Sequence, residues 1–410
     1  MQTGTLPYAK KSKSIYQDLV LKVMAGMNQG LLHLTLQDGE KIIIGNGDAP
    51  FSANMRINDA AFYSRILLYG DVGFGEAYVD GLWDTDNITN VIKWALLNVE
   101  NTPGLSGSQT KKFAYNLFSW CNRWYHNRRA NTLNGSRKNI SAHYDLNNDF
   151  FASFLDPTMT YSSAYYYKDG LSLEEAQLAK YERLCQQLRL TKDDHVLEIG
   201  SGWGGNAIYM ARTYGCKVTS LTISQEQYKL ALERVANEKL QDKVTILLQD
   251  YRMMTGSFDK IVSIEMLEAV GHDYLPVYFA KCHELLKKDG ILAIQVITAP
   301  DSRYDSLRKG VDWIQKHIFP GSLLPSVGAI NSAVNKSGDL TMVDLKDLGL
   351  DYARTLKAWF DAFNDNLLPD MGAAFIRKWN YYLCYCEAAF AMRNINVMQL
   401  VYTRPNNMRR

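Results

Sequence analysis

Short apolar runs alternate with longer amphipathic segments along the second half of the chain. The runs have the length of buried strands and occupy residues 196–199, 217–221, 244–248, 258–264 and 290–297. The amphipathic segments that predict helices occupy residues 205–213, 224–238 and 275–287. Because strands that alternate with helices form parallel sheets, this pattern predicts a doubly wound α/β domain. Two later apolar runs, 340–344 and 397–403, are expected to add edge strands.

The first hundred residues follow a different pattern. Two β-type runs flank Asp38-Gly39, a dipeptide typical of hairpin turns. Helical patterns come next, at residues 59–69 and 71–79. Asp86 is expected to cap a further helix that ends at Leu97. Together these elements predict a smaller α+β domain over residues 1–100.

The chain begins with a basic tail, which includes Lys10, Lys11 and Lys13, followed by an amphipathic stretch from Ile15 to Met27. Such a stretch suits an anionic membrane surface. A helix docked on its own domain behind a basic tail would have the same sequence, so both interpretations stay open.

Residues 101–138 are expected to link the two domains. The stretch 101–108 is rich in Pro, Gly and Ser, which marks a linker, and 111–130 mixes aromatic with basic side chains. That mixture suits a membrane interface, although an ordinary interdomain helix would look much the same. The larger domain then covers residues 139–410.

A glycine-rich turn follows the strand that ends at Ile199. Gly200, Gly202 and Gly204 allow a sharp turn into the next helix and let a ligand approach bare backbone. Glu198 stands just before the turn, where a carboxylate attracts a cationic ligand, whereas a pyrophosphate prefers the bare helix N-terminus. The pattern favours S-adenosylmethionine (SAM), with its sulfonium and ammonium, over a nucleotide, although such turns also occur without a ligand.

Composition narrows the function classes. The 410 residues carry a net charge of +2, so charge gives no support to nucleic-acid binding. The six cysteines show neither metal-ligand spacing nor a disulfide framework, and stand at positions 121, 185, 216, 282, 384 and 386. No apolar signal segment or bilayer-spanning run is present. We therefore expect no metal site and a soluble or membrane-peripheral protein of the cytoplasm.

Four further segments are more specific than the glycine turn: His143-Tyr-Asp-Leu, Leu155-Asp-Pro-Thr-Met-Thr-Tyr-Ser, Thr222-Ile-Ser-Gln-Glu-Gln and Met266-Leu-Glu-Ala-Val-Gly. With them, residues 139–300 resemble the cyclopropane-fatty-acyl-phospholipid synthase family of SAM-dependent fatty-acid methyltransferases. A sparser match extends over nearly the whole chain. The resemblance implies a Rossmann-like class I SAM-dependent methyltransferase fold for the catalytic domain, and a lipid-docking or dimerisation role for residues 1–100.

The resemblance also implies a set of SAM contacts. They are Tyr161, Ser162, Gly200, Gly202, Gly204, Thr222, Ser224, Gln227, Asp250, Tyr251 and Arg252. Thr222, Ser224 and Gln227 would take the place of the usual ribose-binding carboxylate, and residues 250–252 would flank the adenine. Ser224 would also serve as the N-cap of the following helix.

In this family a cis alkene attacks the SAM methyl group, and a base then removes a proton from the carbocation. The resemblance implies that this base is a bicarbonate. Its ligands would be Glu268, Tyr352, the backbone of Ile297, Ser163 at the family's cysteine position and Gln295 at its histidine position. A serine hydroxyl and a glutamine amide donate to an oxyanion but carry no positive charge, so we expect the anion to be held more weakly or in a different pose.

Glu268 is the residue on which we expect the chemistry to depend most. Its alternative role is a helix-capping carboxylate. Glu265 beside it is expected to be structural, or to modulate Glu268 through like-charge repulsion.

The predicted function is methyl transfer from SAM to an unsaturated acyl chain of phospholipid, with closure of a cyclopropane ring. Ser163 and Gln295 place ring closure in doubt, so a fatty-acid methylase is the main alternative. A small-molecule methyltransferase and a non-catalytic lipid-binding protein also stay open. Residues 301–325 mix basic and aromatic side chains, as in a flap against lipid headgroups or in a packed amphipathic helix. The resemblance implies a homodimer at the inner face of the membrane.

Overall fold

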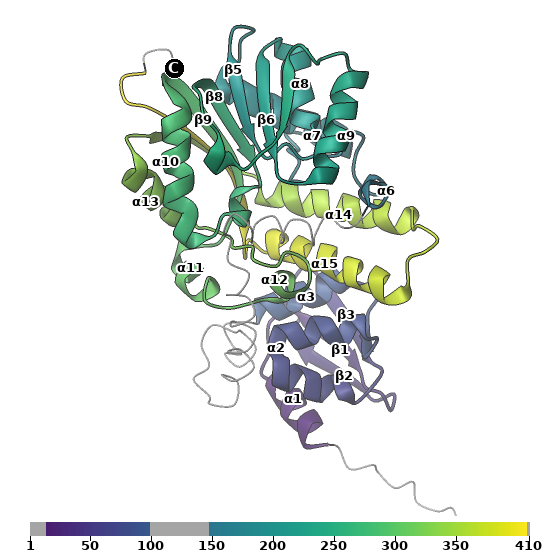
Figure 1. The fold of residues 1–410 in the computed structure, drawn as a ribbon. Helices are drawn as coiled ribbons and strands as arrows, with labels where there is room; N and C mark the ends of the chain where they lie inside the picture. Colours follow the sequence, from purple (N-terminus) through teal and green to yellow (C-terminus); the bar gives the residue numbers. More distant parts are fainter. Residues whose placement is uncertain (1–13, 99–146, 408–410) are drawn as a thin grey trace, which may run out of the picture. The chain divides into compact units, whose positions relative to one another are not determined.

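The structure is a computed structural model that describes residues 14–98 and 147–407 (Figure 1). Its contacts divide the chain into two units, Met1–Tyr115 and Asn116–Arg410, each with its own sheet. The basic tail before residue 14, the linker at 101–138 with its aromatic-basic segment, and the motif at 143–146 lie outside the described residues.

The first unit contains a sheet with the strand order β2-β1-β3-β4. β1 (Leu31–Thr35) and β2 (Lys41–Gly45) pair antiparallel and form the predicted hairpin. β3 (Ser52–Ile57), which the sequence did not reveal as a strand, runs parallel to β1, and β4 (Trp83–Asp84) is antiparallel to β3. Alternate residues of β3 are buried, as in a sheet that is covered on one face.

The helices of this unit are α1 (Ile15–Ala25), α2 (Ala61–Val79) and α3 (Ile88–Leu97). The two helices expected near residue 70 are joined end to end as α2, with a kink at Gly70, where φ is 58°. The cap expected at Asp86 is wrong by one residue. The side chain of Asn87 accepts the N–H of Asn90 and is the N-cap of α3.

The second unit is built on a seven-stranded sheet with the order β10-β11-β9-β8-β5-β6-β7. Its strands are β5 (His195–Ile199), β6 (Lys217–Thr222), β7 (Val244–Leu248), β8 (Phe258–Ile264), β9 (Leu286–Thr298), β10 (Thr341–Asp347) and β11 (Asn396–Thr403). The five predicted strands β5 to β9 are confirmed and pair in parallel. β10 and β11 are antiparallel additions. Of the two strands predicted at the edge, only β10 lies there, because β11 lies between β9 and β10.

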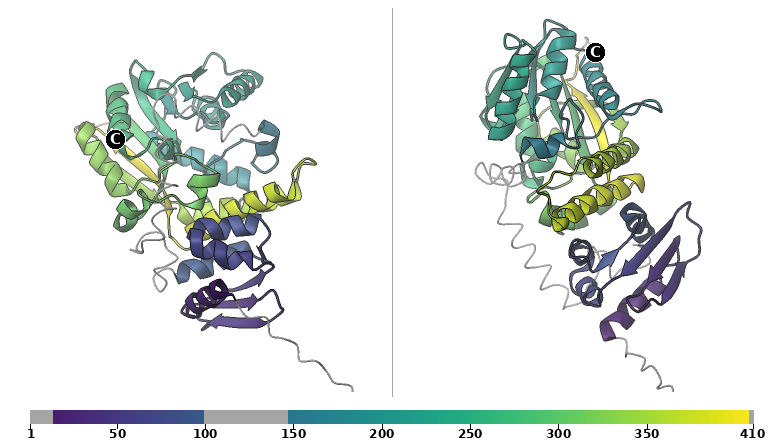
Figure 2. Two further views of the ribbon diagram at one scale, coloured as in Figure 1. Left: turned by 60° about the horizontal axis from the view of Figure 1, so that its bottom comes forward. Right: turned by 90° about the vertical axis from the view of Figure 1, so that its right-hand side faces the viewer.

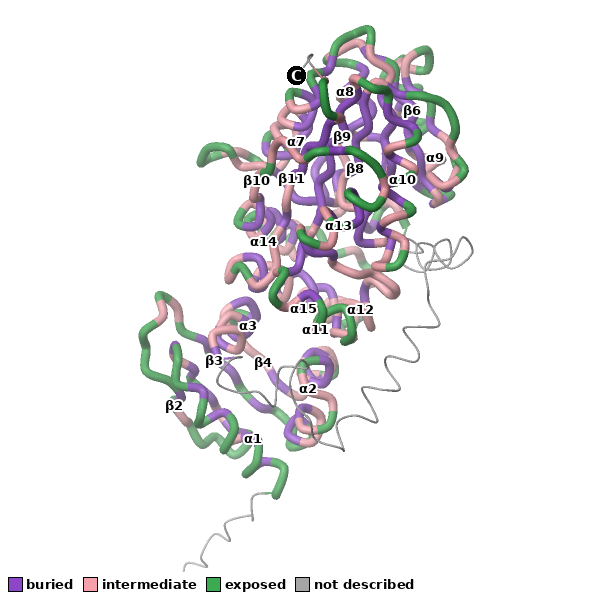
Figure 3. The backbone as a smooth tube through the Cα atoms, turned by 90° about the vertical axis from the view of Figure 1, so that its left-hand side faces the viewer, coloured by how far each residue is buried: buried purple, intermediate pink, exposed green. Residues whose placement is uncertain are grey.

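Helices cover both faces of this sheet (Figure 1). The helices that pack on the two faces are α7 (Leu173–Leu188), α8 (Gly205–Tyr214), α9 (Gln225–Asn237), α10 (Leu275–Leu285) and α13 (Val327–Ser337). One apolar core joins α10 and α13 to Leu197, Ile261 and Leu292, and another joins α7, α8 and α9 to Val196 and Val262. Neighbouring strand residues thus enter opposite cores, and the strands are largely buried (Figure 3).

The strand order reverses at β5, which has β6 on one side and β8 on the other. In such sheets a crevice opens at the carboxyl ends of the strands beside the reversal, and ligands bind there. Two long helices that the strand pattern did not reveal, α14 (Gly349–Asp365) and α15 (Ala373–Ala391), pack side by side (Figure 2). The short helices α6 (Asn148–Ala152), α11 (Asp301–Leu307) and α12 (Trp313–His317) complete the unit.

Candidate active site

The glycine turn lies between β5 and α8, as predicted. Gly200, Gly202 and Gly204 have φ values of 99°, 48° and 86°, which only glycine adopts without strain. The N–H of Gly200 donates to the carbonyl of Leu221 at 3.0 Å and ties the turn to β6. A Cβ on Gly200 would lie 3.3 Å from the side chain of Met266, so the loop after β8 lies directly beside this turn.

Glu198 is buried just before the turn. Its carboxylate accepts Nδ2 of Asn206 at 2.8 Å and the hydroxyl of Ser220 at 2.5 Å. Burial raises the pKa of Glu198 to about 7, while these hydrogen bonds and the charge of Lys180 act against the rise. The carboxyl is therefore only partly ionised at neutral pH and already has protein partners. Direct contact with a cofactor stays a prediction.

Thr222, Ser224 and Gln227 form one hydrogen-bonded group at the carboxyl end of β6. The hydroxyl of Thr222 donates to Oε1 of Gln227 at 2.9 Å and accepts the N–H of Ser224 at 3.1 Å. The hydroxyl of Ser224 accepts the N–H of Gln227 at 3.3 Å, which confirms that Ser224 is the N-cap of α9. The network turns the Gln227 amide oxygen toward Thr222, and the predicted ribose contact of Gln227 stays a prediction.

Asp250, Tyr251 and Arg252 follow β7. Arg252 donates to Asp250 through Nε at 2.9 Å and Nη2 at 2.7 Å, and its guanidinium lies 5.6 Å from the ring centre of Tyr251. The ring of Tyr251 packs edge-on against Tyr278 at 5.3 Å. The guanidinium is thus turned back onto Asp250, and the ring and the carboxylate are the groups held in place beside the predicted adenine position.

Tyr161 stands in a cluster of aromatic rings. Its ring centre lies 5.4 Å from that of Phe151, 5.2 Å from Trp359 and 6.4 Å from Phe319. Its hydroxyl is 2.8 Å from that of Tyr382 on α15. The structure therefore provides the apolar, aromatic surroundings that the expected carbocation chemistry requires.

Ser162 connects this segment to a buried lysine. Its hydroxyl accepts Nζ of Lys180 at 2.7 Å. Burial lowers the pKa of Lys180 to about 7, against the opposing charges of Glu265, Asp156 and Glu198. A lysine that is only partly charged at neutral pH therefore lies among the carboxylates near the strand ends.

Glu265, directly after β8, gathers hydrogen bonds from three separate segments. The backbone N–H of Ser163 and Nε2 of Gln295 both donate to Oε1, each at 2.8 Å. The hydroxyl of Tyr352 on α14 acts on the same carboxylate and favours its ionised form. Burial raises the pKa of Glu265, while these hydrogen bonds and the charge of Lys180 favour the ionised form.

The structure corrects the role expected of Ser163. Its side chain is fully buried, and the hydroxyl donates to the carbonyl of Ala164 at 3.0 Å. The backbone N–H of Ser163, instead of the hydroxyl, reaches an anion, and that anion is Glu265.

Gln295 lies on β9 with its amide fixed on both sides. Nε2 donates to Glu265 and to the carbonyl of Ser163, and Oε1 accepts Nε2 of Gln399 at 2.9 Å. Gln399 is its direct partner on β11. Because a carboxylate only accepts hydrogen bonds, the amide nitrogen of Gln295 must face Glu265, and Gln399 holds it in that orientation.

Tyr352 is buried on α14. Its ring packs against Phe390 at 4.5 Å and Trp359 at 5.9 Å. Burial and the charge of Glu265 raise the pKa of Tyr352 well above its ordinary value. The hydroxyl therefore keeps its proton and stays a hydrogen-bond donor.

Glu268 lies in the short helix η2 (Leu267–Ala269), and its side chain is buried. Oε1 accepts the backbone N–H of Ile297 at 2.5 Å. Oε2 is buried and has no hydrogen-bond partner within the described ranges. Burial and the like charge of Glu265 raise the pKa of Glu268 to about 8. The side chain bonds the backbone of β9, which differs from the alternative of a helix-capping carboxylate.

The five residues predicted to hold a bicarbonate thus lie close together. Their donors, however, bond the carboxylates of Glu265 and Glu268. Gln295 and Tyr352 meet Glu265, together with the backbone of residue 163, and the N–H of Ile297 meets Glu268. The donors that would hold a bicarbonate are already engaged. As placed, these residues do not fit a bicarbonate as an additional ligand.

Sequence reasoning treated Glu265 as secondary and missed Lys180 and Gln399. Lys180 shares a helix face with the buried Ala176 and Leu184, so a charge on an apolar face was the available signal. Gln399 interrupts the apolar run of β11, but only strand pairing shows which residue it faces.

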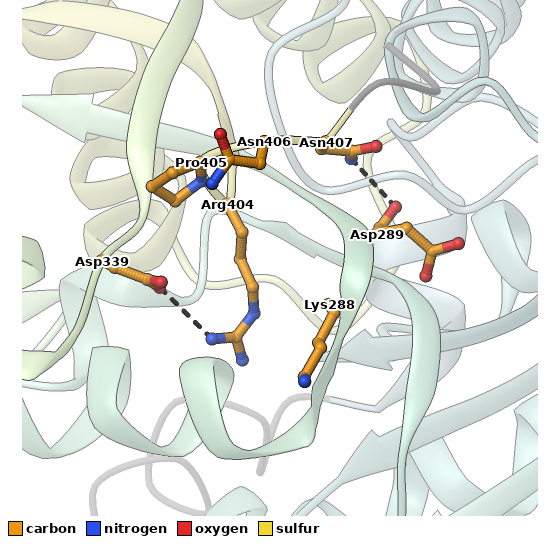
Figure 4. Close-up of a pocket in the computed structure, with 7 residues that line it drawn as sticks. All are labelled: Lys288, Asp289, Asp339, Arg404, Pro405, Asn406 and Asn407. Atoms are coloured by element: carbon orange, nitrogen blue, oxygen red, sulfur yellow. Dashed lines mark hydrogen bonds and ion pairs between the residues drawn. The ribbon is translucent and has the colours of Figure 1, made fainter.

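A separate pocket lies at the amino end of β9. It is lined by Lys288, Asp289, Asp339, Arg404, Pro405, Asn406 and Asn407. In Figure 4, Arg404 points toward Asp339 and Asn407 reaches the backbone of Asp289. Since ligands of parallel sheets bind at the carboxyl ends of the strands, this pocket is at the wrong end for the predicted site.

Comparison with known proteins agrees with this geometry. The family model of mycolic acid cyclopropane synthetase matches residues 131–400. The chain is 38% identical over 372 residues to cyclopropane-fatty-acyl-phospholipid synthase of Escherichia coli K12. This match covers 88% of this chain and 89% of the relative. The chain belongs to this family. It is also 38% identical over 357 residues to tuberculostearic acid methyltransferase UfaA1 of Mycobacterium tuberculosis, over 84% of this chain and 81% of that protein.

Solved structures of the mycolic acid cyclopropane synthases show the same fold. The cyclopropane synthase MmaA2 from Mycobacterium tuberculosis has a TM-score of 0.61 and 29% identity, over 65% of this chain and 98% of that chain. CmaA1, complexed with SAH and CTAB, has a TM-score of 0.59 and 30% identity, also over 65% and 98%. The predicted class I methyltransferase fold and the predicted family are both confirmed.

Replacing Glu268 by Gln should stabilise the protein increasingly toward alkaline pH. A carboxyl with a pKa of about 8 when folded and 4.5 when unfolded binds an extra proton in the folded state between these values. The stabilisation that this extra proton gives the unmodified chain is complete below pH 4.5 and is lost as the pH rises through 8. The free energy of unfolding falls by at most about 1.4 kcal/mol per pH unit. Urea unfolding at several pH values should show the stability of Glu268→Gln rising relative to the unmodified chain.

The matched control is Glu284→Gln, since Glu284 is a largely exposed glutamate. It should show no such trend. A stability difference for Glu268→Gln that does not depend on pH would contradict the raised pKa of Glu268.

Proposed function

We propose that this chain is a SAM-dependent cyclopropane synthase that acts on cis double bonds of unsaturated acyl chains in phospholipid. The observation that carries the proposal is the pairing of two carboxylates, the half-buried Glu265 and the buried Glu268, beside the glycine turn and an aromatic cluster. Family membership and the name of the Escherichia coli relative support the same reaction class.

The strand ends offer a site that suits SAM. The backbone at Gly200 and Gly202 approaches the ligand, the Gln227 amide donates to the ribose hydroxyls, and Tyr251 packs against the adenine. SAM supplies an electrophilic methyl group on a sulfonium. The CmaA1 structure, complexed with SAH, supports this assignment.

The aromatic cluster around Tyr161 stabilises the carbocation that methyl transfer leaves on the acyl chain. Attack by an alkene on a methyl electrophile leaves positive charge on a chain carbon. The rings of Tyr161, Phe319 and Trp359 exclude water from the site, and their negative faces stabilise such a cation.

Glu268 is the group placed to accept the proton. Its Oε2 is buried with no hydrogen-bond partner in residues 14–98 and 147–407, so a lone pair stays free for the substrate. A pKa of about 8 makes it a stronger base than an ordinary glutamate. The positive charge of the bound sulfonium would favour its ionised form.

Methylation without ring closure is the second candidate. The relative named tuberculostearic acid methyltransferase is as similar to this chain, at 38% identity, as the cyclopropane synthase. Loss of a proton from the new methyl group closes the ring, whereas loss from a chain carbon leaves a methyl-branched or methylene-bearing unsaturated chain. The two products differ only in which C–H bond faces the base.

The product decides between these two reactions. Incubation with SAM and vesicles of cis-monounsaturated phospholipid should give high-field cyclopropyl proton signals in the NMR spectrum of the lipid. A methyl or methylene signal with retained unsaturation would establish the methylase instead. Absence of any modified lipid, with turnover of a soluble acceptor, would contradict both.

We further propose that α1 contacts the lipid surface. Within the described residues, no helix combines the length and the apolar character needed to cross a bilayer. One face of α1 is buried, but Ile15, Leu19 and Val23 recur every fourth residue on its other face with exposures of 77%, 45% and 42%. Such an apolar stripe next to basic residues fits a surface of anionic phospholipid.

The triple variant Ile15→Ser, Leu19→Ser, Val23→Ser should weaken co-sedimentation with anionic vesicles and leave the unfolding midpoint nearly unchanged. The matched control is Leu232→Ser, Val277→Ser, Leu367→Ser, three hydrophobic residues of the second unit with exposures of 39%, 45% and 42%. Equal vesicle binding by the two triple variants would rule out the α1 surface.

Residues 301–325 support the packed alternative more than the flap. Trp313 is buried with its ring 4.7 Å from that of Tyr381, and Arg303 donates to Asn394. A homodimer and a location at the cytoplasmic face of the membrane stay predictions.

A further inference from the structure

We infer that Glu265 is a built-in anion that takes the place of a bicarbonate, so that proton removal in this chain depends on two protein carboxylates and on no dissolved anion. This inference rests on the proposed function, since it concerns the base of that reaction. It assigns a positioning role to Glu265 and the proton-accepting role to Glu268.

The donors around Glu265 carry the inference. A small oxyanion in a buried site needs several donors that converge on it from different directions. The N–H of Ser163, Nε2 of Gln295 and the hydroxyl of Tyr352 provide such a set, and all three meet the Glu265 carboxylate. These donors belong to residues where the resemblance predicted bicarbonate ligands.

The backbone conformation at Glu265 places its carboxylate at these donors. Glu265 has φ of 48°, a left-handed conformation that costs a non-glycine residue free energy and is kept only where the surroundings compensate. Its own N–H donates to the carbonyl of Gln295 at 2.7 Å, so the turn is tied to the same strand that donates to the side chain. Gln399 holds the Gln295 amide in its donating orientation.

The two glutamates are placed for different roles. Burial raises the pKa of Glu265, while the donors on its carboxylate and the charge of Lys180 act against that rise and favour the ionised state. Glu268 has one backbone donor on Oε1, while Oε2 has no partner among the residues described. A carboxylate oxygen that already accepts two hydrogen bonds, as Oε1 of Glu265 does, is a poor proton acceptor, whereas the Glu268 oxygen with a free lone pair is a better one.

Every bond and charge in the proton-removal step is accounted for by the substrate and Glu268. A C–H bond of the newly added methyl group breaks, and its electron pair forms the C–C bond to the cationic carbon, which closes the ring. The proton goes to Oε2 of Glu268 and gives a neutral carboxylic acid. Glu265 keeps its negative charge throughout, and no further reactant is consumed.

The charged and titratable groups that act on this pair come from two helices and from the loop after β8. Lys180 from α7 and Tyr352 from α14 act on Glu265, and Glu265 acts on Glu268 through its negative charge. Replacing Glu265 by Gln removes that charge and keeps the shape of the side chain. The acid limb of the pH profile of kcat should then move to lower pH, because Glu268 ionises more easily. Glu284→Gln should leave the profile unchanged.

The decisive variant is Glu265→Gly, which relieves the left-handed backbone strain and opens the space of the carboxylate. In bicarbonate-free buffer the unmodified chain should be fully active and gain nothing from added bicarbonate. Glu265→Gly should lose on the order of a hundredfold in kcat without bicarbonate and recover most of it when bicarbonate is added. Stimulation of the unmodified chain by bicarbonate, full activity of the variant without it, or a folded variant that bicarbonate does not restore would each overturn the inference.

A binding measurement separates this inference from the proposed function. Line broadening of ¹³C-labelled bicarbonate needs no acyl substrate, and should occur with Glu265→Gly but not with the unmodified chain or Glu284→Gln. If this pattern holds while no lipid is modified, the proposed function fails, and what stands is that Glu265 occupies the site that a bicarbonate would otherwise take. If the unmodified chain binds bicarbonate while it modifies lipid, the inference fails and the function stands.

Discussion

Three segments that are far apart in the sequence meet at the half-buried carboxylate of Glu265. Ser163 precedes α7, Gln295 lies on β9 and Tyr352 on α14. A buried charge is stable only when hydrogen bonds and countercharge compensate for the water it has lost. The packing of these elements is therefore constrained by this one group, and Lys180 supplies the opposite charge. Removing any single donor would leave part of the carboxylate uncompensated, which makes the arrangement specific.

The sheet determines where this group acts. β5 and β8 are neighbours at the point where the strand order reverses, so the glycine turn after one strand lies beside the two glutamates after the other. In the proposed mechanism, topology thus brings together a cationic methyl donor at the turn and a base after β8. The aromatic rings around Tyr161 surround the same region and keep water from competing for the cation or the base.

Much of this could be predicted from the sequence, because buried strands and a glycine turn have local signatures. The strands β5 to β9 and the cap at Ser224 were found in this way. The position of β11 inside the sheet was not, because strand order depends on pairing between distant segments. The role of Glu265 was underestimated for the same reason, since its donors come from residues 102 and 30 positions away in the chain. Ser163 was assigned by its side chain, whereas its backbone N–H makes the contact.

The proposed mechanism depends most on the free oxygen of Glu268, and the most direct test separates catalysis from binding in the variant Glu268→Gln. Turnover on phospholipid vesicles and the calorimetric affinity for SAM should be measured on the same preparation. We predict that kcat falls by roughly a hundredfold or more, as expected for loss of a general base, while the Kd for SAM stays within about twofold. Near-normal turnover, or loss of SAM binding together with turnover, would contradict the assignment of Glu268 as the proton acceptor.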